Sequence, residues 1–180
     1  MKKILVIFFA ILALQSNAQL NKASLQASGL TCAMCSNAIN KALQKIPFVA
    51  SVKSDIKNSS FNIVFKENTN VNIDDLKKAV EDAGFSVAKL NVTGNFDNVH
   101  VKNDEHVIIN GTTFHFLKVN DQVLTGEKTL LVVDRNFITA KEFKKYSAVT
   151  KMSCLQTGKS APCCVKDGIA ANTRIYHVTI

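Results

Sequence analysis

The sequence predicts an α+β protein, and three observations on residues 23–92 and 95–180 lead to this fold class. Two stretches of the first part place apolar residues three and four positions apart, which is the pattern of an amphipathic helix. Three other stretches alternate polar and apolar residues, as half-buried strands do, and a fourth is strand-like. Their order is β-α-β-β-α-β, which is the ferredoxin-like pattern. The second part contains mostly strand-like stretches, so we expect a separate β-rich domain there.

The first strand and the first helix of residues 23–92 flank two cysteines. Ser24-Leu25-Gln26-Ala27-Ser28 alternates as a strand does, and Gly29-Leu30-Thr31-Cys32-Ala33-Met34-Cys35 follows it. The apolar stripe of the helix comes next and consists of Ala38, Ile39, Ala42, Leu43 and Ile46. We therefore expect Cys35 in the first helical turn and Cys32 in the loop before it.

This placement suits metal binding. The unpaired backbone N–H groups and the dipole at a helix N-terminus favour negative charge. They therefore favour the thiolate, which is the form of cysteine that binds a metal ion. Two soft sulfur ligands three residues apart can hold one soft ion such as Cu(I) or Zn(II). Cys32 and Cys35 are accordingly the predicted metal ligands.

The remaining elements of the first part follow from alternation and from capping residues. Strands are expected at residues 49–57 and 60–65, with a turn between them. Asn72 can cap a second helix, and Gly84 has the position of a C-terminal glycine. A closing strand is expected at residues 85–92.

These residues resemble the heavy-metal-associated (HMA) domain, a family that includes copper chaperones, metal-binding modules of copper ATPases and the periplasmic mercury-binding protein. The matching segments are Gly29–Cys35, Ala38-Ile39, Ala42-Leu43 and Asp75–Phe85. The resemblance covers residues 23–92 and implies that Cys32 and Cys35 bind the metal and that Phe85 packs against the site. The family usually has methionine where this sequence has Leu30, a change that keeps the apolar volume.

The resemblance implies a protein that binds a soft metal ion, Cu(I), and transfers it through the CxxC thiolates; the N-terminal segment described below places this role in the cell envelope. Its partners would be a metal-transporting membrane protein or another metallochaperone. We find no catalytic motif and expect no enzyme activity. Two alternatives remain for the same cysteines: a thiol–disulfide oxidoreductase, and a scavenger of mercury or zinc. Against the oxidoreductase, Thr31 stands where thioredoxin-like proteins have an aromatic residue, and tryptophan is absent.

The N-terminal segment predicts export. Lys2 and Lys3 precede the apolar run of residues 4–14, and small residues lead up to Ala18. This is the pattern of a signal peptide over residues 1–18, and the run is shorter than the ~20 residues of a spanning helix. We therefore expect a periplasmic or secreted protein with no stable membrane insertion after cleavage.

The charge pattern argues against a nucleic-acid partner. The chain carries a net charge of +8, but its lysines are scattered along the sequence rather than gathered in a block. An exported protein also rarely meets nucleic acid.

The second part, residues 95–180, is expected to follow a linker at Gly94-Asn95. Asn110-Gly111 favours the type I′ turn of a tight hairpin. The expected elements are a hairpin of residues 107–109 and 112–117, strands at 129–133 and 175–180, and a helix opened by the capping box of Thr139 and Glu142. One helix among several strands suggests a small closed or half-closed barrel that resembles the OB-fold.

Several side chains of the second part carry candidate chemistry: Met152, Cys154, Cys163, Cys164, His100, His106, His115 and His177. Cys154 lies before a polar loop, so in an oxidising compartment we expect a disulfide to Cys163 or Cys164. Two alternatives remain: a second soft-metal site built from these thiols with Met152 or His177, and thiols that stay unpaired. His115 alternates with two phenylalanines, and we expect it to face solvent.

Overall fold

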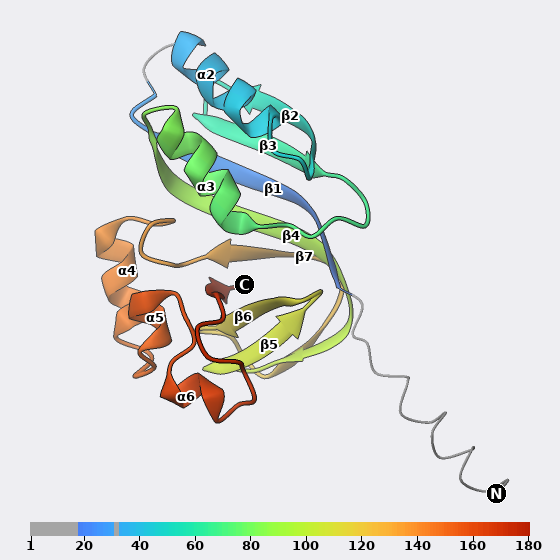
Figure 1. The fold of residues 1–180 in the computed structure, drawn as a ribbon, viewed down its shortest axis with the longest axis vertical. Coiled ribbons are helices and arrows are strands. Elements are labelled where there is room, and N and C mark those ends of the chain that lie inside the picture. The colour runs from blue at the N-terminus through green and yellow to red at the C-terminus, as the bar shows by residue number, and fades with distance from the viewer. Residues whose placement is uncertain (1–17, 31–32) are drawn as a thin grey trace, which may run out of the picture.

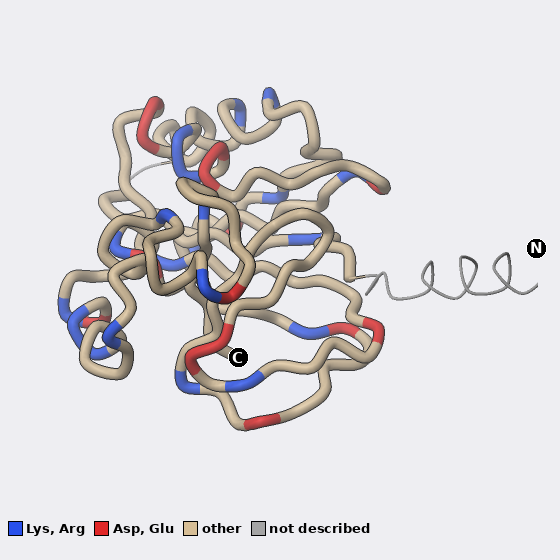
Figure 2. The backbone as a smooth tube through the Cα atoms, turned by 60° about the horizontal axis from the view of Figure 1, so that its bottom comes forward, with Lys and Arg blue, Asp and Glu red and all other residues tan. Residues whose placement is uncertain are grey.

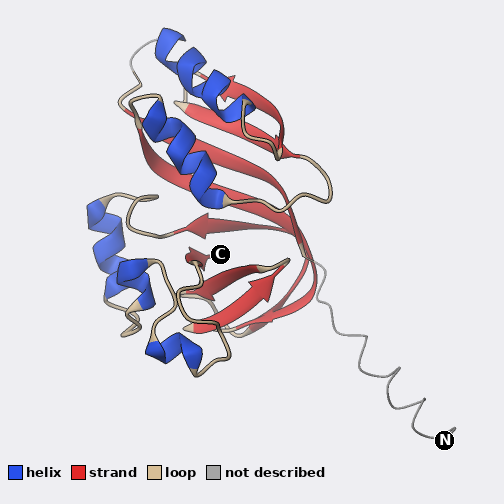
Figure 3. Ribbon diagram, viewed as in Figure 1, coloured by secondary structure: helices blue, strands red, loops and turns tan. Residues whose placement is uncertain are grey.

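The computed structural model describes residues 18–30 and 33–180. The predicted signal peptide lies outside the described residues apart from Ala18, and Cys32 lies outside them too. The chain folds around an extended sheet, and the helices lie to the left of its strands in the view of Figure 3.

The first half of the chain has the predicted βαββαβ order. Its elements are β1 (Gln19–Ser28), α2 (Ala33–Gln44), β2 (Val49–Asp55), β3 (Ser60–Phe65), α3 (Ile73–Asp82) and β4 (Ser86–Val101). The strands lie in the order β2-β3-β1-β4, and α2 and α3 pack on one face of them (Figure 1). The ferredoxin-like prediction is therefore confirmed for this half.

The caps of α3 act as the sequence predicts. The side-chain oxygen of Asn72 accepts a hydrogen bond from the backbone N–H of Asp74 at 3.2 Å. Asp74 and Asp75 lie in the first turn, where the helix dipole favours acidic side chains. After the last turn, Gly84 adopts a φ of +85°, which a residue with a side chain rarely adopts.

The second half adds four strands and three short helices. These elements are β5 (Glu105–Ile109), β6 (Thr112–Phe116), β7 (Gln122–Val132), α4 (Ala140–Ser147), α5 (Cys154–Thr157), α6 (Pro162–Val165) and β8 (Ile175–Thr179). Asn110 and Gly111 have φ angles of +46° and +75°, so the predicted hairpin with two positive-φ turn residues is confirmed. The capping box of Thr139 and Glu142 is also present.

The eight strands found in the described residues belong to one sheet, in the order β2-β3-β1-β4-β7-β8-β6-β5. Strand β4 makes this continuity, because it pairs with β1 on one side and with β7 on the other. The predicted OB-like barrel is not confirmed, since β2 and β5 end the sheet and it does not close. The physical reason is that β4 continues past the first half and extends the existing sheet.

Gly94 and Asn95 lie inside β4, so the predicted linker at these residues is wrong. A Cβ atom at Gly94 would lie 2.8 Å from the backbone oxygen of Gln19. Strand β1 shifts its register against β4 between Leu20 and Lys22, next to this contact. Glycine here marks a close backbone approach and not a flexible connection.

The hydrophobic core also runs through both halves. Leu25 and Phe61 of the first half and Phe114 and Phe116 of the second are fully buried in one cluster. Among the described residues, none of the helices combines the length and the apolar character needed to cross a membrane. Lysine and arginine are spread along the backbone of both halves (Figure 2).

A polar contact joins α3 to β8. The guanidinium of Arg174 donates from Nε and Nη2 to the two oxygens of Asp74, at 2.7 and 3.0 Å, and from Nη2 to Asp134 at 2.9 Å. The Tyr176 hydroxyl donates to Asn72 Oδ1 at 3.1 Å. Burial raises the pKa of Asp74, but the hydrogen bonds and charge of Arg174 outweigh it and hold that pKa below 3.8.

We predict that Arg174→Met lowers the free energy of unfolding by about 2–3 kcal/mol, because it leaves Asp74 and the buried Asp134 without their cation. Arg135→Met is the matched control, since Arg135 donates to the neutral Gln156 at the surface and should cost less than about 1 kcal/mol. Urea denaturation measures both values.

The same contact predicts a pH dependence. Because the folded pKa of Asp74 is lowered, its contribution is present above pH 3.8 and is lost as the pH falls through the folded pKa. The stability gap between the wild type and Arg174→Met should therefore narrow in acid. A gap that is constant down to the acid transition would contradict this assignment.

We also predict that Gly94→Ala destabilises the protein by about 1–3 kcal/mol, because a backbone oxygen cannot move away as a flexible side chain can. Thermal or urea unfolding tests this change. An unchanged midpoint would show that β1 and β4 can separate at this point without cost.

Candidate metal centre

The candidate metal-binding loop connects β1 to α2. Gly29, with φ of +80°, turns the chain after β1, and Leu30 packs against the main core. Helix α2 begins at Ala33, so Cys35 lies in the first helical turn and is partly buried. This confirms the predicted position of Cys35, whereas the placement of Cys32 stays a prediction because that residue is not described.

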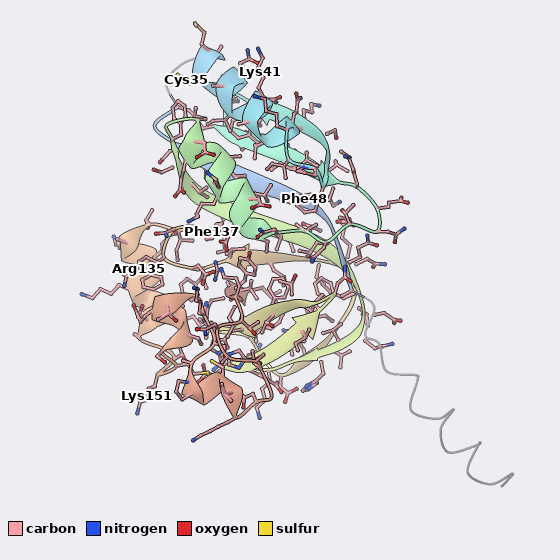
Figure 4. All side chains as sticks on the ribbon, in the orientation of Figure 1. Cys35, Lys41, Phe48, Arg135, Phe137 and Lys151 are labelled. Carbon is pink, nitrogen blue, oxygen red and sulfur yellow. The ribbon has the colours of Figure 1, made fainter. Side chains whose placement is uncertain are left out.

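The surroundings of Cys35 favour negative charge. The first turn of α2 contains no acidic residue, and Lys41 lies in the last turn. The positive end of the helix dipole near Cys35 is therefore not offset by a carboxylate of its own turn. Met34 is 84% exposed, which places its thioether in solvent. Figure 4 shows Cys35 at the N-terminal end of α2, far from the core of the second half.

Phe85 lies at the same end of the sheet as this loop. The residue after it, Ser86, pairs with Ser28, the last residue of β1. The Ser28 hydroxyl donates to the backbone oxygen of Ser86 at 3.3 Å. Phe85 and Leu30 are both partly buried against the main core. The predicted position of Phe85, in a loop beside the CxxC loop, agrees with this register.

Most of the candidate residues of the second half come together. Cys154 at the start of α5 and Cys164 on α6 are fully buried, and Cys163 and Met152 are partly buried beside them. The side chains of three histidines point to the same region: His106 from β5, His115 from β6 and His177 from β8. His100 is not part of this group, and its ring lies at the surface 2.7 Å from Asp121.

The expectation that His115 faces solvent is wrong. Its side chain is fully buried, because β6 lies between β5 and β8 and both faces of β6 are covered. Burial, followed by the nearby His177 and His106 rings, lowers the pKa of His115 to about 4. The ring of His115 is therefore neutral at pH 7.

The predicted disulfide from Cys154 to Cys163 or Cys164 is not formed, and all three are free thiols. The sulfur of Cys154 instead lies 3.4 Å from Nε2 of His177. The sulfurs of Cys163 and Cys164 lie 3.6 Å apart, well beyond the ~2.05 Å of a disulfide bond.

Comparison with known proteins places the first half in a family. Residues 24–86 match the model of the heavy-metal-associated domain. The copper chaperone CopZ of Staphylococcus haemolyticus is 34% identical over 59 residues, which are 33% of this chain and 85% of that protein. The chain belongs to the heavy-metal-associated domain family.

Other relatives share the same HMA domain. A copper-transporting ATPase of Helicobacter pylori is 37% identical over 68 residues, which are 38% of this chain. The chain spans only 9% of the length of that ATPase. The structure of oxidized MerP from Ralstonia metallidurans CH34 aligns with 39% of this chain and 96% of its own, at 28% identity and a TM-score of 0.34. The second half, with its histidines, lies beyond the HMA match.

Proposed function

We propose that this protein binds Cu(I) through Cys32 and Cys35 of its HMA domain and transfers the ion to a partner by exchange of thiolate ligands. The observation that carries the proposal is Cys35 in the first turn of α2, three residues after Cys32 in the sequence, inside a domain whose relatives are named copper chaperone and copper-transporting ATPase. Thiolate ligands match the softness of Cu(I).

Exposure of the loop supports a transfer role. Ala33 and Met34, which lie between the two cysteines, are both exposed. A partner's thiols can therefore approach the ion while it is still held here. Each new metal–sulfur bond can then form before an old one breaks, so the ion never has to pass free through water.

The partner and the compartment follow from the same proposal. An ion on an exposed CxxC suits a second HMA-type module, carried by a metal-transporting membrane protein or by another metallochaperone. The basic and apolar start of the chain supports export to the periplasm or beyond. In that compartment, copper would be collected or passed on outside the cytoplasm.

We predict that Cys32→Ser and Cys35→Ser each weaken Cu(I) binding to the HMA domain by more than about 100-fold. Replacing a residue that only orients a metal ligand already lowers metal affinity by about 10–100-fold, and loss of the ligand itself should cost more. Titration against a competing Cu(I) chelator, in a background with Cys154, Cys163 and Cys164 all changed to alanine, isolates this site from the thiols of the second half. Met34→Ala is the control and should leave the affinity unchanged, because its side chain is in solvent.

Unchanged Cu(I) affinity in both cysteine variants would refute the ligand assignment. An insulin-reduction assay separates a carrier from an oxidoreductase. The proposal expects no more activity than a small free dithiol shows, and rapid turnover that requires Cys32 would overturn it in favour of redox exchange.

A further inference from the structure

We propose that Cys154 and the histidines 106, 115 and 177 form a second metal site, which takes a zinc or copper ion. The site lies in the second half of the chain, outside the HMA match, and is independent of Cys32 and Cys35. Imidazole and thiolate ligands together suit these ions.

The three sulfur–nitrogen distances at Cys154 are those of ligands on one tetrahedral ion. Three imidazole nitrogens surround it, at 3.4 Å for His177 Nε2, 3.7 Å for His115 Nδ1 and 3.8 Å for His106 Nε2. Metal–sulfur and metal–nitrogen bonds of about 2.3 and 2.0 Å at tetrahedral angles separate sulfur from nitrogen by about 3.6 Å. The ligand atoms of His106, His115 and Cys154 also lie within 4.8 Å of one another. His177 Nε2 does not belong to that group, so the His177 ring has to move toward the other two histidines before all four ligands can bind one ion.

The sheet aligns the histidines in one row. His106 pairs directly with His115 across β5 and β6, and His115 pairs directly with His177 across β6 and β8. Directly paired residues share one face of a sheet, so the three rings stand side by side. The His106 and His115 rings are stacked at 4.4 Å, and α5 brings Cys154 over the row. In Figure 4, sulfur is visible where α5 and α6 meet the strands.

Each ring is held by a carboxylate on its outer nitrogen, as in the carboxylate–histidine–metal arrangement of many metal proteins. A nitrogen that donates to a carboxylate leaves the other nitrogen of a neutral ring with its lone pair free for a metal ion. The three outer pairs are His177 Nδ1 with Asp134 at 2.6 Å, His115 Nε2 with Asp104 at 3.0 Å and His106 Nδ1 with Asp167 at 3.0 Å. In all three, the remaining nitrogen is the one that faces Cys154.

Burial distinguishes this group from an ordinary polar surface. Cys154, His115 and His177 are fully buried, and the His106 side chain is 2% exposed. Polar side chains in a core are costly unless their hydrogen-bonding and ligating groups are used. The single S–H group of Cys154 cannot donate a hydrogen bond to all three imidazole nitrogens that face it. A bound cation can accept a lone pair from each of these nitrogens and from the sulfur.

A cysteine nucleophile is the competing interpretation of the same residues. Cys154, His177 and Asp134 are connected in the order of a nucleophile, a base and an orienting carboxylate. A nucleophile must reach its substrate, however, and the sulfur of Cys154 is fully buried beneath two further imidazoles. The arrangement therefore favours a metal ligand.

The test uses the full chain carrying Cys32→Ser and Cys35→Ser, so that the outcome is separate from that of the HMA site. Zn(II), Cu(I), Cu(II) and the spectroscopic probe Co(II) are titrated separately. We expect one equivalent of zinc or copper per chain, a rise in thermal midpoint, and sulfur-to-cobalt charge-transfer bands with tetrahedral Co(II). Absence of binding by all four ions would overturn the proposal without any further variant.

Variants then assign the ligands in the same background. Cys154→Ser should remove the charge-transfer bands, and His106→Gln, on the outermost strand, should weaken binding by more than about 100-fold. Asp104→Asn should lower the metal affinity by about 10-fold, and asparagine tolerates the positive φ of this position. Asp121→Asn is the matched control, since Asp121 holds the surface ring of His100 and should have no effect.

Thiol reactivity tests the competing interpretation. We expect Cys154 to react slowly with iodoacetamide in the folded protein and more slowly still with bound metal. Rapid alkylation of Cys154 in a protein that binds none of the ions would identify a nucleophile and refute the metal site.

Discussion

The structure depends on the two-sided pairing of β4. Its first residues pair with β1 inside the HMA domain, and residues 91–101 pair with β7, so one strand belongs to the ladders of both halves. Backbone hydrogen bonds along a shared strand fix the register of everything attached to it. The second half is therefore an extension of the HMA sheet, and the histidine row and the CxxC loop are carried on one rigid frame.

The ion-paired Arg174 adds a second connection between the halves. It holds Asp74 at the start of α3 and one oxygen of Asp134, whose other oxygen holds Nδ1 of His177 at 2.6 Å. The orientation of the His177 ring thus depends on a carboxylate that is itself positioned from the HMA half. A continuous run of polar contacts reaches from α3 to the sulfur of Cys154, through the partly buried Asp74 and Arg174 and the buried Asp134 and His177.

Local patterns in the sequence predicted the parts of the fold that local forces set. The helical stripes, the Asn72 cap, the Thr139 capping box and the Asn110-Gly111 turn all have partners within a few residues. The two-residue turn also fixes the register that sets His106 opposite His115. His177 had no such signal, because it reaches the row by parallel pairing of β8 with β6, which sets it beside His115 although the two are 62 positions apart in the chain. The same long-range covering of β6 buried His115, although alternation had placed it in solvent.

The position of β5 at the end of the sheet sets how the histidine row can open. Strand β5 pairs with β6 alone, so its hydrogen bonds can break locally while β6 and β8 stay intact. His106 is the one histidine of the row on that strand. Fraying of a five-residue edge strand would therefore release a single ligand and leave a three-coordinate ion open to an incoming group. The lifetime of an ion in the row would then follow the local opening of β5 and not the global stability of the protein.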